Sequence, residues 1–291
     1  MIYLLLSILA STFIFVIFKL FNRFKINTFQ AIVVNYMVAC TSGLIAFDGT
    51  VNFSEIPEYD WFYYTIALGA LFIIVFNLMA STTQKSGLSV VSVATKMSVV
   101  VPILFGLLYY KESLSFLKIV GIILALLAVY LVSIKSEAGL KINRRSLYLP
   151  VLVFLGSGII DTSLKYLEEA FVAENDVPIF SATIFASAGL IGILIVLIMV
   201  IRGKIKLQLK NIVAGICLGV PNYFSIYFLV KALRTGLLDS SGIFTVNNVA
   251  IVMLSTLIGI LLFTERLQKK NWLGIVFAIL SIFLIALGTE S

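Results

Sequence analysis

Long uncharged, apolar runs recur along the whole chain, and short polar segments separate them. None of the runs has the two-residue alternation of a membrane β-barrel strand, and a helix needs about 20 apolar residues to cross the hydrocarbon layer. A helix also satisfies its backbone hydrogen bonds within its own segment. The pattern predicts ten membrane-spanning helices, near residues 2–21, 28–47, 61–83, 88–110, 115–134, 147–167, 178–201, 211–232, 237–263 and 271–288.

The composition supports an all-α integral membrane protein. Hydrophobic residues make up 61% of the 291 residues and charged residues only 12%, whereas soluble domains carry about 25% charged residues. The first 18 residues lack the basic segment that precedes the apolar core of a signal peptide, so we expect a first membrane helix there. The polar connectors are too short to hold a soluble domain.

Several kinds of chemistry find no support in the sequence. Cys40 and Cys217 both fall within predicted spans, which argues against a disulfide framework. The chain has no histidine, the commonest metal ligand and the usual acid–base group near neutral pH. A zinc signature, a serine triad and a glycine-rich phosphate loop are also absent. We therefore expect no enzyme, no cofactor and no metal site.

The net charge of +7 is explained by topology. Of the 21 lysine and arginine residues, 15 lie in or beside the connectors after spans 1, 3, 5, 7 and 9, five lie on the other side, and one lies within the membrane. The positive-inside rule places the richer side in the cytoplasm and both termini outside. We expect the bilayer and a small molecule as partners, and no nucleic acid. The sequence leaves the oligomeric state open, and a monomer is compatible with it.

An internal repeat divides the chain. Glu112-Ser113-Leu114 is followed by Gly121, and Glu265-Arg266-Leu267 is followed by Gly274 with the same spacing, 153 residues later. Each block ends one span and opens the last span of its half. Because five spans per half is an odd number, the second copy must enter the membrane in the opposite direction. Inverted repeats of this kind are typical of secondary transporters, which bind substrate at midplane between the copies.

We therefore expect two inverted five-helix repeats, at residues 1–137 and 138–291. With Lys19 ending span 1 and Pro102 in span 4, this layout resembles the drug/metabolite transporter superfamily in its EamA-like ten-helix form. The resemblance implies a proton-coupled or gradient-driven carrier in the plasma or inner membrane, commonly an exporter of amino acids, metabolites or drugs. It also implies cytoplasmic termini, opposite to what the charges predict. The tryptophan frequent in span 1 of such proteins is absent here.

Two charged residues within spans are candidates for function. Lys96 lies about 12 Å along span 4, where a lysine costs at least about 2.5–3.5 kcal/mol. It could anchor a substrate carboxylate or phosphate, or it could form a structural ion pair with Asp161 or extend its amine toward the membrane edge. Asp161 is the candidate for proton coupling, although its spacing from Lys165 equally allows a local pair on one helix face.

Polar residues within the spans complete the candidate substrate site. The repeat places Asn247 and Asn248 at a depth similar to that of Lys96, where they could bind a polar substrate or join helices by hydrogen bonds. Weaker substrate-binding candidates of the same kind are Asn35, Asn77, Asn222 and Tyr223.

Structural roles are predicted for other prominent residues. Glu112 and Glu265 precede helices whose positive N-terminal ends a carboxylate stabilises, and Trp61 and Trp272 lie at span edges, where tryptophan anchors helices at the headgroups. Prolines within spans could bend their helices or be tolerated without consequence, and glycines permit close helix approach. These residues are Pro102, Pro221, Gly69, Gly106, Gly121, Gly156, Gly158, Gly215, Gly219, Gly259 and Gly274.

The favoured hypothesis is a secondary-active exporter or exchanger of a small metabolite, an amino acid or another carboxylate-bearing compound, working by alternating access. The alternative is a lipid-handling flippase or a membrane scaffold that transports nothing. A membrane-embedded enzyme ranks last, because no catalytic constellation is present.

Overall fold

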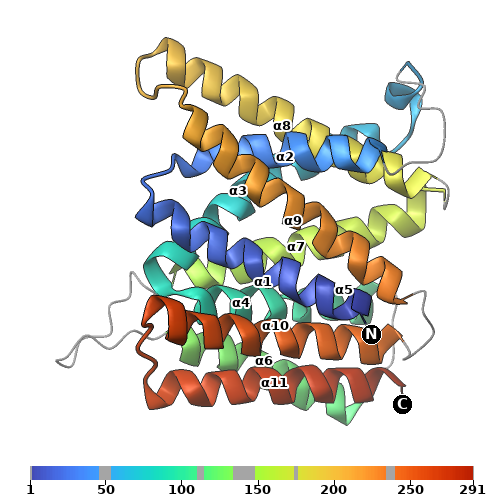
Figure 1. Ribbon diagram of the computed structural model, residues 1–291. Coiled ribbons are helices and arrows are strands. Elements are labelled where there is room, and N and C mark those ends of the chain that lie inside the picture. The colour runs from blue at the N-terminus through green and yellow to red at the C-terminus, as the bar shows by residue number, and fades with distance from the viewer. Residues whose placement is uncertain are drawn as a thin grey trace. The chain divides into compact units, whose positions relative to one another are not determined.

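The computed structural model describes residues 2–45, 54–109, 115–133, 148–173, 176–233 and 240–290. All regular secondary structure in these ranges is helical. The helices are α1 (Ile2–Arg23), α2 (Thr28–Ile45), η1 (Ile56–Glu58), α3 (Phe62–Ser86), α4 (Leu88–Met97), α5 (Val100–Tyr109), α6 (Phe116–Ser133), α7 (Tyr148–Phe171), α8 (Val177–Ile201), α9 (Leu209–Leu233), α10 (Ser240–Phe263) and α11 (Lys269–Glu290) (Figure 1).

Each predicted span coincides with helix. Within the described ranges, nine segments are long and apolar enough to cross a membrane, and α6 contributes a shorter apolar segment, Phe116–Val132. The predicted span 4 is made of two helices, because α4 and α5 together cover it. The expectation of an all-α membrane protein is confirmed.

The helices form two compact units. Unit 1 comprises Met1–Lys19, Leu78–Ile159 and Ser225–Ser291, and unit 2 comprises Leu20–Asn77 and Ile160–Phe224. Each unit therefore draws segments from both halves of the sequence. This division differs from the sequence repeats at 1–137 and 138–291, whose boundaries stay a prediction.

In unit 1, α6 and α11 pack along each other in antiparallel directions (Figure 1). Near the start of α6, a Cβ added to Gly121 would lie 2.7 Å from Ile285 Cγ1, close to the end of α11. Near the start of α11, a Cβ on Gly274 would lie 2.9 Å from Val132 Cγ1, close to the end of α6. Small residues let membrane helices approach closely, and the packing role predicted for these two glycines is confirmed.

The core of unit 1 lies where α4, α6, α10 and α11 meet. Its fully buried side chains include Val93 and Met97 of α4, Val252 of α10 and Ala278 of α11. Apolar burial drives folding from water, but lipid is itself apolar, so close side-chain packing stabilises this contact. The cluster places α4 beside α10, the two helices that carry Lys96 and the Asn247-Asn248 pair.

In unit 2, α2 packs against α8 and α9 through glycines of those two helices. A Cβ on Gly189 of α8 would lie 2.6 Å from Met37 Sδ, and one on Gly192 would overlap Val33 Cγ2. The residue numbers fall on one helix as they rise on the other, so α2 and α8 are antiparallel. Gly215 of α9 makes an equivalent contact with Val34 of α2. The residue numbers rise together on these two helices, so α9 runs parallel to α2.

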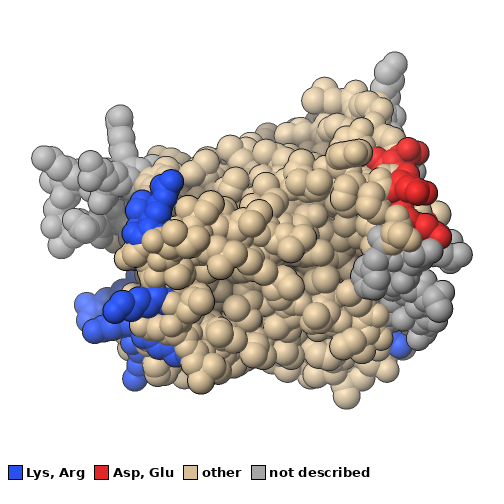
Figure 2. All heavy atoms as spheres, turned by 90° about the horizontal axis from the view of Figure 1, so that it is seen from above, with Lys and Arg blue, Asp and Glu red and all other residues tan. Residues whose placement is uncertain are grey.

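The two ends of α2 differ in charge within unit 2. Beside its first turn, the Lys206 carbonyl accepts a hydrogen bond from Gln30 Nε2 at 3.1 Å, and Lys210 Nζ donates to the Lys25 carbonyl at 3.1 Å. Figure 2 shows the acidic side chains gathered in one patch on the visible surface. Exposed acidic residues of unit 2 follow α2 in the sequence, and these are Glu55, Glu58 and Asp60. This separation supports the sorting of charges by membrane side, while the orientation itself stays a prediction.

Trp61 is not a lipid-facing anchor, and that prediction was wrong. Its side chain is 1% exposed, stacks on Tyr59 with ring centroids 4.7 Å apart, and meets Phe180 edge to face at 5.5 Å. The aromatic neighbours in unit 2 bury a residue that position alone would place at the headgroups. Trp272, by contrast, is about half exposed.

Candidate functional site

Span 4 is interrupted in its middle, where α4 ends at Met97 and α5 begins at Val100. The cause is Pro102, which has no N–H to donate to the Ser98 carbonyl four residues earlier. The Val101 N–H donates to that carbonyl at 2.9 Å, which tightens the turn. Ser98 Oγ in turn donates to the Thr95 carbonyl at 2.6 Å. Side-chain and shortened backbone hydrogen bonds thus replace regular helix at this point.

Lys96 lies in the last turn of α4, directly before the interruption, and it is partly buried. A cation in this position is favoured by the negative C-terminal end of the helix dipole, by about 0.3–1 kcal/mol. That gain is smaller than the cost of about 2.5–3.5 kcal/mol for a lysine near mid-membrane. The sequence singled out this lysine by its depth, and the structure adds that it flanks interrupted backbone.

A neighbouring glycine allows α7 to pack closely against the interruption. A Cβ on Gly158 would overlap Val101 Cγ2 and lie 3.0 Å from the Ser98 carbonyl oxygen, and all three residues belong to unit 1. The packing role predicted for Gly158 is confirmed, and any larger residue would push the two segments apart.

Asn247 is buried in unit 1 at 2% exposure, beside Ser7 of α1. Ser7 Oγ lies 2.8 Å from the Ser225 carbonyl and 3.3 Å from Asn247 Oδ1. A hydroxyl has one proton, and the shorter contact to the carbonyl takes it. The Asn247 amide is therefore better placed with its nitrogen donating to Ser7 Oγ, an orientation that is assigned from the hydrogen bonds. Asn248, next along α10, is partly buried.

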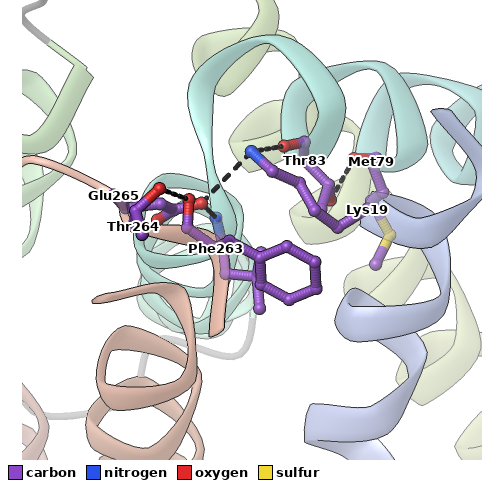
Figure 3. A network of polar contacts seen from close by, with 7 residues as sticks. Lys19, Met79, Thr83, Phe263, Thr264 and Glu265 are labelled. Carbon is purple, nitrogen blue, oxygen red and sulfur yellow. Dashed lines mark hydrogen bonds and ion pairs between the residues drawn. The ribbon is translucent and has the colours of Figure 1, made fainter. Parts of the chain in front are cut away.

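The other end of α4 is held by Glu265, from the connector between α10 and α11 (Figure 3). The Leu88 N–H, at the first residue of α4, donates to Glu265 Oε1 at 2.8 Å. Lys19 Nζ lies 3.3 Å from the same oxygen and also donates to the Thr83 carbonyl at 3.3 Å. A carboxylate thus satisfies one of the free N–H groups of a helix N-terminus and is paired with a lysine.

Sequence reasoning assigned the Glu265 carboxylate to the wrong helix. We expected it to cap the helix that follows it, but α11 begins only at Lys269, and the carboxylate binds the N-terminus of α4. Lys19 and Glu265 were each noted as parts of sequence motifs. Their 246-residue separation gave no signal that they pair. Glu112, the repeat counterpart, lies outside the described residues.

The asparagines of unit 2 form a separate pair. Asn222 Nδ2 of α9 donates to Asn35 Oδ1 of α2 at 3.1 Å, and both side chains are buried. Among the described residues, the Nδ2 of Asn35, at 0% exposure, has no hydrogen-bond partner. Asn77 bonds within its own helix, to the Ile73 carbonyl, and Tyr223 is partly buried with its ring edge to face with that of the next residue.

Asp161 lies on the part of α7 that belongs to unit 2, and its side chain is exposed, as is that of Lys165 one turn later. Lys96 belongs to unit 1. The candidate residues are thus divided between units: Lys96, Asn247 and Asn248 lie in unit 1, and Asn35, Asn77, Asp161, Asn222 and Tyr223 lie in unit 2.

Comparison with known proteins identifies the family. A model of the EamA-like transporter family matches residues 1–134. An uncharacterized protein of Haemophilus influenzae (strain ATCC 51907 / DSM 11121 / KW20 / Rd) is 30% identical over 285 residues, which cover 96% of each chain. The family match agrees with the duplicated sequence blocks and the helical spans. The chain belongs to the EamA-like transporter family.

Proposed function

We propose that the protein is a secondary-active transporter of a small carboxylate-bearing metabolite, such as an amino acid, and that Lys96 binds the substrate carboxylate. The observation that carries this proposal is the interruption of span 4 directly after Lys96. Discontinuous helices near the bilayer midplane form the substrate and ion sites of many secondary transporters. Irregular backbone at that depth is tolerated only where protein or a water-filled cavity satisfies it.

The residues around the interruption suit a zwitterionic ligand. The Lys96 amine offers three donors to a carboxylate, and an ion pair there would offset the cost of a charge within the membrane. Asn247 and Asn248 lie on α10, which packs against α4. Each side-chain amide has both an N–H donor and a carbonyl acceptor for a polar substrate.

The paired packing of equivalent spans supports alternating access. α6 and α11 are spans 5 and 10, α2 and α8 are spans 2 and 7, and α4 and α10 are spans 4 and 9. Each pair joins one span to the span five later. In an inverted repeat, exchange of the two conformations between such partners opens the site to either side. Asp161 is the proposed proton-coupling residue, since carboxylates relay protons in other carriers.

The alternative function is a lipid-handling flippase or a scaffold that transports nothing. A flippase would bind lipid headgroups rather than free carboxylates, and a scaffold would need no ligand. Neither function accounts for a lysine beside an interrupted helix as directly as a carboxylate site does. The plasma or inner membrane is the proposed location.

Ligand-linked stabilisation tests the carboxylate site. The purified protein would be melted in detergent with each of the twenty amino acids, a set of dicarboxylic acids and the amide of each compound. A ligand at 100 times its Kd stabilises the folded state by about 2.7 kcal/mol. We expect at least one free carboxylate, but not its amide, to raise the Tm of the wild type and to leave that of Lys96→Ala unchanged. Equal stabilisation of both proteins would remove Lys96 from the site.

A further inference from the structure

The Glu265 carboxylate sits in a site that is built around it. Its side chain is 11% exposed and contacts the Leu88 N–H at 2.8 Å and Lys19 Nζ at 3.3 Å. The Glu265 N–H donates to the Gly259 carbonyl at 2.9 Å, which fixes the connector backbone at the same point. Thr264, the preceding residue, has a φ of 51°, a conformation that costs energy for a residue with a Cβ.

Two glycines make room for this carboxylate. A Cβ on Gly87 would lie 2.7 Å from both carboxylate oxygens, and a Cβ on Gly259 would lie 2.6 Å from Oε2. Gly87 also has a φ of 112°, which strongly favours glycine. The α3–α4 turn and the end of α10 are thus shaped to admit an anion, and the connector supplies one.

Side-chain packing against α6, α10 and α11 holds α4 along its length, and the Glu265 contact fixes its first turn. α4 has ten residues, and the break after Met97 removes the rigid continuation that an unbroken span would provide. Lys96 lies eight residues beyond Leu88, about 12 Å along the helix. Because α4 is short and helical, a shift of its first turn also shifts its last turn, where Lys96 lies.

We propose that Glu265 is the positioning residue for Lys96: by binding the Leu88 N–H it sets the depth and rotation of α4, and so the place of the lysine amine. This inference rests on the proposed function. Lys19 supports the carboxylate by pairing with it. Lys19, Leu88 and Glu265 all belong to unit 1, and Figure 3 shows the ion pair between Lys19 and Glu265.

Cysteine labelling measures the position of residue 96 without knowledge of the substrate. In a background with Cys40→Ala and Cys217→Ser, a single cysteine would replace Lys96. Its rate of reaction with sodium (2-sulfonatoethyl) methanethiosulfonate would be measured in membrane vesicles. The same measurement would be made with Glu265→Ala, Glu265→Gln and, as a control for charge on the same connector, Arg266→Ala.

Glu265→Ala removes the acceptor of a charge-assisted hydrogen bond at the first turn of α4, and we expect the rate at position 96 to rise about tenfold. Glu265→Gln keeps an acceptor oxygen and loses the ion pair, so its rate should rise by less. Arg266→Ala changes an exposed side chain and should leave the labelling rate at position 96 unchanged. If Glu265→Ala proves misfolded by size-exclusion chromatography, Glu265→Gln carries the test, with a rise still expected.

Equal labelling in the parent and in the folded Glu265 variants, including no labelling in any of them, would overturn the inference. The result is separable from the proposed function. If Lys96→Ala still binds the carboxylate but the labelling rate depends on Glu265, the proposed function fails and the positioning role stands. If Lys96→Ala loses carboxylate binding but the labelling rate does not depend on Glu265, the positioning role fails and the proposed function stands.

Discussion

Gly121 and Gly274 make the same contact in opposite directions. They are 153 residues apart, and so are their respective partners, Val132 and Ile285. Gly121 meets Ile285, and Gly274 meets Val132, so the α6–α11 pair has a local twofold pseudosymmetry. An inverted duplication would place equivalent helices side by side in this way, whereas two copies with the same direction would give parallel partners.

Substitution of either glycine by leucine should destabilise the protein to a similar degree. The nearest backbone atoms lie 3.2 Å from the Cβ position at Gly121 and 3.0 Å from that at Gly274, so the helices must separate. Overpacking of this kind costs about 1–3 kcal/mol. Thermal unfolding in detergent would measure it, with the exposed Leu126→Ile as control. A large loss for one variant and none for the other would contradict the pseudosymmetry.

Gly259→Ala should reproduce the effect of Glu265→Ala. The added methyl group would lie 2.6 Å from Glu265 Oε2 and would displace the carboxylate from the Leu88 N–H. We expect the same rise of about tenfold in labelling at position 96, which corresponds to about 1.4 kcal/mol. Combining the two substitutions should add nothing further, because both remove one contact. Additive effects would show that Gly259 acts through another neighbour.

The Asn35–Asn222 pair should contribute little to stability. The repeat maps Asn35 to Ala188 and Asn222 to Gly69, and these two residues, neither of which has a polar side chain, lie in close contact in unit 2. The fold therefore does not need an amide pair at this place. A double-mutant cycle with alanines should give a coupling near the average of about 0.6 kcal/mol for interhelical hydrogen bonds in membranes. A coupling several times larger would assign the pair a structural role.

Pro102→Ala should separate stability from ligand binding. The substitution restores an N–H that can donate to the Ser98 carbonyl, so α4 and α5 can join into one helix. A proline within a helix costs about 3 kcal/mol or more, and we expect the variant to melt at the same temperature as the wild type or higher. The carboxylate that stabilises the wild type should no longer do so. Retained stabilisation by that ligand would mean that the interruption does not form the site.

The fold could be predicted because lipid imposes a simple rule on sequence. Each span must be a long apolar helix, so ten runs gave ten spans whose limits lie within a few residues of the described helices. The division of span 4 was less visible. Pro102 signalled a possible bend, but no polar connector separates residues 88–97 from residues 100–109. Only the hydrogen bonds of Ser98 and Val101 show where the helix ends.

The site was predicted less well because its contacts join distant segments. Lys96 stood out as a charge within a span, the structure places it partly buried beside the break, and its role stays a proposal. The partner of Glu265 could not be found from spacing, because capping rules consider only the helix adjacent in sequence. The prediction that Trp61 anchors its helix at the headgroups was wrong for a related reason. Its burial depends on Phe180, which lies more than 100 residues away in the sequence.

Transport by the reconstituted protein is the most direct test of the central claim. Proteoliposomes loaded with the carboxylate that stabilises the wild type would be given the same compound in labelled form, and counterflow would be measured for wild type, Lys96→Ala, Lys96→Arg and the exposed control Lys270→Ala. The account predicts counterflow by wild type and Lys270→Ala, its loss in Lys96→Ala, and partial retention in Lys96→Arg. Counterflow by Lys96→Ala at the wild-type rate, or none by the wild type, would contradict it.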